Sequence, residues 1–398
     1  MKDSETTGSL AAIAAPFFMA LGFIIWDKTW SKSGGSAFAL NLYKCNLASI
    51  GFVVASLIFG FRIDDDETDS ETIKESVGFL VLSGFIGIIV GDLAWLEALR
   101  QLGATRVIVL DCIKPFSAAF FGWIILGESI QKLAFSGIVL TVMGVLIVSL
   151  EAERKDLEWK HRSTSEIDEE DAQPNSENGE EDQLKNDSND NEEDIIESIS
   201  EEQASPSIQI KLKPEQLPPT ITHTNTRTSQ WNTRKGYILA VGNVFLDTYG
   251  SVLTKQHGKS FSSWTINLIR FASSGVIMFA LSCFMCLYER KRPSSNKSRN
   301  SSTVPWYRLP QIDSQSWMKI SIGVLFVTFL YSALNNYALF QISLGLALSL
   351  GSITPLYALF LEWPIYGEEK RPTLRSIGGA TLAIGGVVIL SIYNSEEK

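Results

Sequence analysis

The chain is poor in the residues from which catalytic and metal sites are built. Its 398 residues include 4 cysteines and 3 histidines. All four cysteines lie in apolar stretches, where a thiol usually behaves as a small hydrophobic side chain. The sequence contains no Gly-rich phosphate loop, no nucleophile elbow and no cluster of metal ligands. These absences exclude the common enzyme classes, and we expect no catalytic residue, no metal and no cofactor.

Charged residues are scarce over long parts of the chain, and these parts are apolar. About 20 such residues in a helix cross the roughly 30 Å hydrocarbon layer of a bilayer. The expected spans are residues 9–26, 38–61, 77–99, 107–126, 133–150, 237–253, 266–288, 320–342, 346–366 and 377–393. The sequence therefore predicts an all-α polytopic membrane protein with about ten transmembrane helices.

The amino-terminal segment lacks the basic region of a signal peptide, and its acidic residues argue against an organellar transit peptide. We therefore expect the first span to be retained. Which membrane holds the protein, the plasma membrane or an endomembrane, stays open.

One polar segment separates two groups of five spans. Between residues 163 and 202 the chain has seventeen Asp and Glu residues and one Lys. Without them the formal net charge changes from −10 to +6, so the acidity belongs to this segment and implies no nucleic-acid partner. A segment of this composition cannot bury enough apolar surface to fold alone.

The sequence also repeats itself in order. The matches at an offset of 240 are Ala98–Leu99 with Ala338–Leu339, Pro115 with Pro355, Trp123 with Trp363, and Gly127–Glu128 with Gly367–Glu368. The matches at neighbouring offsets are Asn41 and Lys44 with Asn267 and Arg270, and Gly137 and Gly144 with Gly378 and Gly385. A collinear series over several spans indicates a duplication.

Each half holds an odd number of spans, so the second half must enter the membrane from the opposite side. The halves are therefore expected to be inverted repeats, an architecture of secondary transporters whose site lies where the repeats meet. The expected domains are a first five-helix repeat at 1–150, an acidic disordered linker at 151–235, and a second repeat at 236–398 with a basic loop at 289–313.

In each half an Ala-Leu pair ends the third span, which also carries Asp92 in the first half. A fourth span with a central proline then closes on Gly-Glu, and a fifth span carries glycines. This pattern resembles EamA-type members of the drug/metabolite transporter superfamily, over essentially all of the chain except the acidic segment. The resemblance implies a ten-helix transporter of amino acids, metabolites, nucleotide-linked sugars or drugs. Family members that carry phosphorylated sugars place Lys and Arg near the ends of their late helices, whereas residues 346–366 contain no cation, which argues against such substrates.

Ionisable side chains within the spans are the main functional candidates, because each costs at least a few kcal/mol in hydrocarbon unless it is paired or hydrated. They are Lys44, Asp92, Asp111, Lys114, Asp247, Arg270 and Glu362. Asp111 and Lys114 share a helical face, and they form either a private ion pair or a site for a polar or zwitterionic solute. Asp92 and Asp247 are the candidates for proton coupling.

Lys44 and Arg270 occupy equivalent places in the two halves. They either converge on a central cavity or extend to the membrane interface. The candidate substrate-binding residues are Lys44, Asp111, Lys114, Arg270, Tyr331, Asn335, Asn336 and Tyr337. The last four form a polar run in the eighth span that either binds a solute or joins helices.

Pro115 and Pro355 each remove a backbone donor, so we expect them to kink the fourth helix of each half. Glu128 and Glu368 follow a glycine at the end of that helix, where a role in folding or gating is expected. The four matching glycines of the fifth spans are expected to permit close helix approach.

Two arguments give opposite orientations. The family resemblance implies that both termini face the cytoplasm. Lys and Arg, however, concentrate in the odd-numbered connections, and the positive-inside rule places those connections and the acidic linker in the cytoplasm. Sequons at 296–298 and 300–302 distinguish the two, because glycosylation there in a eukaryotic host requires a lumenal connection.

These observations predict a secondary transporter that carries a small polar or amphipathic metabolite by alternating access between two inverted repeats. The alternative is a non-transporting membrane scaffold or receptor that acts through its acidic linker. The expected partners are a small-molecule solute and the lipid bilayer. A homodimer and a protein partner for the acidic linker stay open.

Overall fold

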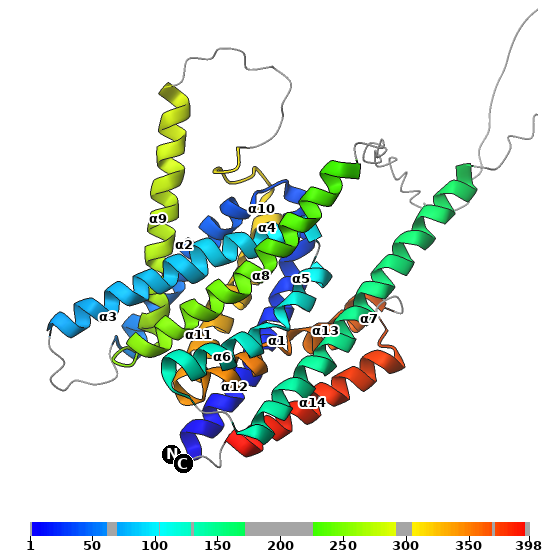
Figure 1. Cartoon of the computed structure of the whole chain (residues 1–398). Helices are drawn as coiled ribbons and strands as arrows, with labels where there is room; N and C mark the ends of the chain where they lie inside the picture. The colour runs from blue at the N-terminus through cyan, green and yellow to red at the C-terminus, as the bar shows by residue number, and fades with distance from the viewer. Residues whose placement is uncertain are drawn as a thin grey trace, which may run out of the picture. The chain divides into compact units, whose positions relative to one another are not determined.

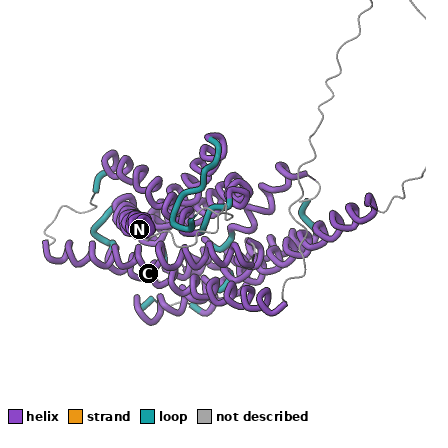
Figure 2. The backbone as a smooth tube through the Cα atoms, turned by 90° about the horizontal axis from the view of Figure 1, so that it is seen from above, coloured by secondary structure: helices purple, strands orange, loops and turns teal. Residues whose placement is uncertain are grey.

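The computed structural model describes residues 2–61, 70–102, 104–128, 131–171, 226–291, 305–367 and 371–394. Most of the predicted acidic linker and of the basic loop lies outside these residues. The chain divides into two compact units, one made of Met1–Glu158 with Thr228–Lys398 and the other of Trp159–Arg227. The first unit contains both predicted repeats. Within the described ranges the backbone forms helices and loops and no β-strand (Figure 2).

The helices of the two halves follow the same order along the chain (Figure 1). Those of the first half are α1 (Lys2–Ser33), α2 (Ala37–Phe59), α3 (Ser70–Ser83), the π-helix η1 (Gly84–Gly91), α4 (Asp92–Leu102), α5 (Ala104–Asp111), α6 (Lys114–Leu126) and α7 (Lys132–Asp171). Those of the second half are α8 (Thr226–His257), α9 (Ser263–Lys291), α10 (Ser314–Val324), the π-helix η2 (Leu325–Leu330), α11 (Tyr331–Gln341), α12 (Leu344–Gly351), α13 (Thr354–Tyr366) and α14 (Leu374–Asn394). Both α7 and α8 extend into the range expected for the linker.

Local signals in the sequence set several of these helix ends. Ser36 caps α2 by accepting a hydrogen bond from the backbone N–H of Ala39 at 3.0 Å. Asp313 caps α10 by accepting from the N–H of Ser316 at 3.0 Å. Gly127 ends α6 with φ of 67°, a left-handed conformation that favours glycine.

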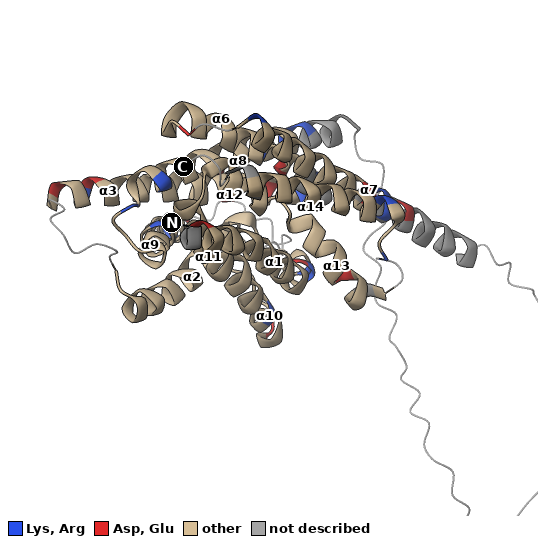
Figure 3. Cartoon of the chain, turned by 90° about the horizontal axis from the view of Figure 1, so that it is seen from below, with Lys and Arg blue, Asp and Glu red and all other residues tan. Residues whose placement is uncertain are grey.

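Seven helical segments of the described chain are long and apolar enough to cross a membrane, and Lys114–Leu126 and Leu374–Leu390 are shorter apolar helices. Together with α8, they account for the ten predicted spans. The α8 helix is less apolar because it carries polar side chains that are buried in the bundle, among them Asn243 and Thr248. Figure 3 shows that many of the charged residues lie near helix ends. Large apolar side chains such as Leu57 and Phe284 are exposed, as a lipid-facing surface requires.

The second helices of the two halves, α2 and α9, run antiparallel. The side-chain oxygen of Asn46 lies 3.3 Å from where a Cβ of Gly275 would be. The rings of Phe52 and Phe271 stack with centroids 5.6 Å apart. The hydroxyl of Ser262, just before α9, donates to the carbonyl of Gly60, just after α2, at 3.0 Å. Equivalent helices of opposite direction are the geometry of an inverted repeat.

The fifth helices, α7 and α14, are also antiparallel and touch through glycine. A Cβ on Gly144 would lie 2.4 Å from the backbone nitrogen of Ala383, and a Cβ on Gly137 would lie 2.9 Å from the carbonyl oxygen of Gly386. On α14 the contact is made by Gly379 and Gly386. We expected Gly378 and Gly385 to make this close approach, and that expectation was wrong, because a shift of one residue turns a helical position by about 100°. A Cβ on Gly378 would have no neighbour within 4 Å.

Two irregularities recur at equivalent places in the repeats. The third helix of each half contains a π-helical segment, η1 or η2, at positions related by the offset of 240. The fourth helix of each half is broken, between α5 and α6 and between α12 and α13, with Pro115 and Pro355 in the first turn of the second piece. The predicted kinks are therefore complete breaks. Broken helices near a repeat interface are typical of transporter binding sites.

The glycine contact yields a first prediction. Replacing Gly144 by Ala should lower the free energy of unfolding by about 1–3 kcal/mol, since the new methyl group overlaps the α14 backbone. The matched Gly378→Ala should leave it unchanged or raise it by up to about 1 kcal/mol, because its methyl group enters open space and alanine favours helix. Thermal unfolding of the solubilised variants measures both, and equal effects would contradict the close contact of α7 with α14 at Gly144.

Candidate substrate site

The first ion pair of the site joins α2 to the start of α4. Lys44 Nζ lies 3.0 Å from a carboxylate oxygen of Asp92. The Lys44 residue is only 6 % exposed, so its side chain does not extend to the membrane surface. Asp92 directly follows the π-helix η1, and π-helical segments are frequent at functional sites.

The second group of charges centres on Lys114 and links the two repeats. Its Nζ lies 3.4 Å from Asp111, across the break between α5 and α6, and 3.3 Å from Asp247 on α8. The indole N–H of Trp95 donates to Asp111 at 3.2 Å. An acid at the carboxyl end of α5 and a cation at the amino end of α6 oppose the helix dipoles. Helix propensity therefore does not account for these charges, whereas their mutual pairing does.

Arg270 on α9 is the third cation and is only 7 % exposed. Its guanidinium makes no hydrogen bond or ion pair with any described residue, and its Nε is a buried donor without a partner. The charges of Asp247 and Asp92 are near enough to interact with it. One terminal nitrogen lies 3.4 Å from where a Cβ of Gly87 in η1 would be, so the absence of a side chain there leaves room for the guanidinium.

The four predicted binding residues of the polar run at 331–337 lie in different environments. Tyr331 is half-buried and lies within electrostatic reach of Lys114, Asp111 and Asp247. Asn336 is buried and donates to the side chain of Asn267 at 2.5 Å, so it joins α11 to α9. Tyr337 is exposed.

The remaining contacts of the run lead away from the charges. The hydroxyl of Tyr337 lies 3.1 Å from that of Thr7 on α1. The side-chain oxygen of Asn335 lies 3.9 Å from where a Cβ of Gly351 would be, at the end of α12. Of the four residues in the run, the structure therefore brings Tyr331 to the charged group.

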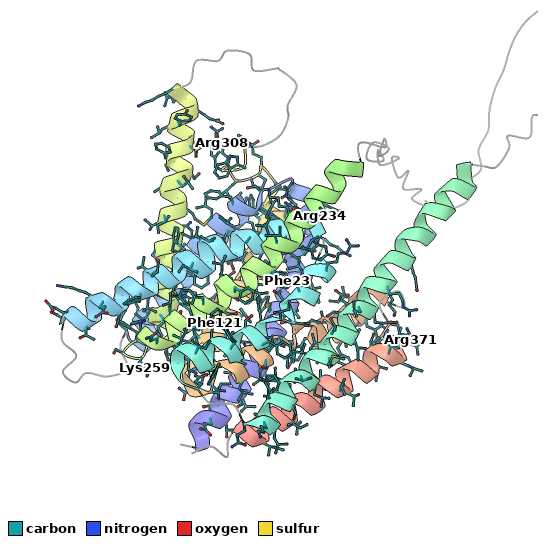
Figure 4. All side chains as sticks on the ribbon, viewed as in Figure 1. Phe23, Phe121, Arg234, Lys259, Arg308 and Arg371 are labelled. Carbon is teal, nitrogen blue, oxygen red and sulfur yellow. The ribbon has the colours of Figure 1, made fainter. Side chains whose placement is uncertain are left out.

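Aromatic residues pack α6 against α8 beside the charges. The ring of Phe121, labelled in Figure 4, lies 6.4 Å from that of Phe245 and 6.1 Å from that of Tyr249. These two residues flank Asp247 along α8. Phe23, also labelled, packs against Trp95, whose indole holds Asp111. The charged group is thus bordered by ring systems on two sides.

A second inter-repeat cluster lies where α6 ends. Lys255 near the end of α8 lies 2.5 Å from Glu128 and donates to the carbonyl of Ile342 at 2.7 Å. The other oxygen of Glu128 accepts from the backbone N–H of Leu344 at the start of α12, at 2.8 Å. Glu128 and Lys255 also line a pocket of about 270 Å³ together with Lys259. Three helices from both repeats are tied together at this end.

Sequence reasoning identified the charged residues but not their partners. It left open whether Asp111 and Lys114 form a private pair, and the structure adds Asp247 to that pair. It left open whether Lys44 and Arg270 reach the interface, and both are buried. It did not single out Trp95 or Lys255, because no spacing in the sequence relates them to their partners. Glu368 lies outside the described residues, and Glu362 is half-buried on α13.

The geometry defines a polytopic helical membrane protein with two inverted repeats and a charged interior. The chain belongs to the EamA-like transporter family, whose model matches residues 6–150 and 234–392. A comparison with curated proteins gives no match. Among 25 matching chains of solved structures, one titled "Crystal structure of protein" has 11 % sequence identity, full coverage of both chains and a TM-score of 0.56. At that identity the likeness shows the fold alone.

The position of Lys114 yields a second prediction. Lys114→Met should lower the free energy of unfolding by about 1.5–3 kcal/mol, because it leaves two half-buried carboxylates without their charged hydrogen-bond partner. Adding Asp111→Asn to the same chain should recover part of this loss. Thermal unfolding in detergent measures both, and Lys319→Met, which removes an exposed cation from α10, is the control. A Lys114 variant as stable as the control would show that the contacts of Lys114 with Asp111 and Asp247 do not stabilise the fold.

Proposed function

We propose that the protein is a secondary transporter that binds a small polar or amphipathic solute at the group formed by Lys44, Asp92, Lys114, Asp247 and Arg270, and that it moves this solute by alternating access. The observation that carries the proposal is the Lys114–Asp247 pair, which joins α6 of one repeat to α8 of the other. A site shared by two inverted repeats changes its exposure when the repeats rock against each other.

The contacts of Glu128 with Lys255 and Leu344 support the proposal of alternating access. The Glu128–Lys255 pair and the bond from Leu344 tie the end of α6, the end of α8 and the start of α12 together. Figure 4 places Arg234, Arg308 and Arg371 along one side of the bundle and Lys259 along the other. We therefore assign the Glu128–Lys255 cluster to a closed gate on the Lys259 side, which must separate when that side opens.

Proton coupling is assigned to Asp247 and Asp92. Asp247 has the most exposed side chain in the group, at 36 %, and shares one lysine with Asp111. Protonation of Asp247 would leave Lys114 bonded to Asp111 alone, so the charge balance of the pocket can change without unpairing a cation. Asp92, at 29 %, is the second accessible carboxylate.

The third prediction tests transport directly. Purified protein in liposomes should accumulate a solute from a broad metabolite panel when a pH gradient is imposed. Because a hydrogen bond to a charged group contributes about 1.5–3 kcal/mol, Asp247→Asn should lower this uptake by about tenfold or more. Glu75→Gln, which removes an exposed acid from α3, is the matched control, and a chain lacking residues 163–202 should retain transport. A protein that moves nothing across the panel would overturn the proposal.

The fourth prediction tests the gate. Glu128→Ala removes the acceptor for the Leu344 N–H and the partner of Lys255. Since such charged hydrogen bonds contribute about 1.5–3 kcal/mol, amide hydrogen exchange in the first turn of α12 should become about ten- to a hundredfold faster. The first turn of α10, capped by Asp313, is the internal control. Unchanged exchange at Leu344 would show that Glu128 does not hold this end closed.

A further inference from the structure

Arg270 differs from the other two cations of the charged group, Lys44 and Lys114, because it is not paired with any aspartate that the structure describes. Among the described residues, Lys44 is bonded to Asp92, and Lys114 to Asp111 and Asp247. The Arg270 guanidinium carries five N–H donors and always stays charged, yet none of these donors meets a protein acceptor in the described part of the chain. A buried cation of this kind is retained at a cost, which points to a ligand that satisfies it.

The duplication shows which position lacks the aspartate that would pair with Arg270. Arg270 is the counterpart of Lys44, and the counterpart of Asp92 at the offset of 240 is Ser332. The first repeat thus pairs its second-helix cation with an aspartate of the third helix, while the second repeat has a serine at that place. Asn267, one turn from Arg270, donates to the backbone carbonyl of Ser332 at 3.1 Å, so α11 does lie against this part of α9. The two helices meet as in the first repeat, but no carboxylate is supplied.

We infer that the solute supplies that carboxylate, so that the transported compounds are organic carboxylates or amino-acid-like zwitterions bound through Arg270. The planar guanidinium matches a carboxylate with two parallel hydrogen bonds. A phosphate dianion would bring two charges to one unpaired cation, because the two lysines are already held by aspartates. That such carboxylates are transported rests on the proposed function. That they bind at Arg270 does not depend on it.

The charge balance also bears on what accompanies the carboxylate. The charges of the three cations and three aspartates in this group cancel, so a bound carboxylate leaves one net negative charge. A proton on Asp247, or a cationic group on the same solute, restores neutrality. A lone dianion would leave two net negative charges and is therefore disfavoured. An uncharged solute keeps the balance but supplies no carboxylate to the donors of Arg270.

The fifth prediction uses matched probes on the solubilised full chain. The probes are acetate, benzoate and alanine, each compared with its amide, which has nearly the same shape without the carboxylate charge. A ligand of the folded state raises the unfolding temperature by mass action. We expect at least one carboxylate to raise it in a saturable way while its amide does not. If no carboxylate stabilises the protein more than its amide does, the inference is wrong.

Variants then assign the effect to Arg270. Arg270→Gln should weaken carboxylate binding by about tenfold or more, as expected for the loss of a charge-assisted hydrogen bond. Arg290→Gln, which removes an exposed arginine from the end of the same helix, should leave binding unchanged. If Arg270→Gln does not fold, Arg270→Lys keeps the charge but loses the planar fork, and it should bind several-fold more weakly. Equal binding in the wild type and the Arg270 variant that folds would overturn the inference.

This inference and the proposed transport can fail separately. Carboxylate binding through Arg270 in a protein that moves nothing in liposomes would refute transport alone. Uptake of uncharged or cationic solutes that is unaffected by Arg270→Lys would refute the carboxylate site alone. Stabilisation by chloride or inorganic phosphate equal to that by every carboxylate would also refute it, because the site would then be a general anion site.

Discussion

A charge inside the hydrocarbon layer is costly unless it is paired or hydrated, and the contact of α6 with α8 follows from that cost. Lys114 illustrates the point, because a single ammonium group holds Asp111 of its own repeat and Asp247 of the other. Removing this ammonium group would leave two carboxylates without their cation. The contact that satisfies the charges is therefore also a contact that fixes α6 against α8.

The duplication explains the scaffold, whereas the charges depart from it. Antiparallel α2 and α9, antiparallel α7 and α14, the paired π-helical segments and the paired helix breaks all obey the repeat. Among the three cations and three aspartates of the site, only Lys44 and Arg270 follow the repeat, since the positions equivalent to Asp92, Asp111 and Lys114 are Ser332, Gly351 and Thr354. For the proposed transporter, a symmetric scaffold would favour two states of opposite access at similar free energy, and an asymmetric charged group could orient a solute with two chemically different ends.

Much of the fold could be predicted because it is encoded locally or at a constant offset. Runs of apolar residues give the spans, and the prolines mark the breaks before α6 and α13. The pairing of Lys114 with Asp247 could not be predicted, since it depends on which faces of distant helices meet. The glycine contact of α14 shows the same limit at smaller scale. The repeat located glycines on the correct helix, but only packing distinguishes Gly379, which touches α7, from Gly378, which does not.

The Lys114–Asp247 pair and the Glu128–Lys255 pair both join α6, or the residues just after it, to α8. Lys114 at the start of α6 binds Asp247 on α8, Phe121 packs against Phe245 and Tyr249 further along, and Glu128 just after α6 binds Lys255 near the end of α8. A solute or proton that weakens the Lys114–Asp247 pair therefore loosens one of the contacts that hold α6 to α8. Because helices move as rigid elements, the strain of that change reaches the Glu128–Lys255 pair without a chain of intermediate residues. In the proposed transport cycle, the stiffness of α6 and α8 would couple solute binding at Lys114 and Asp247 to opening at Glu128 and Lys255.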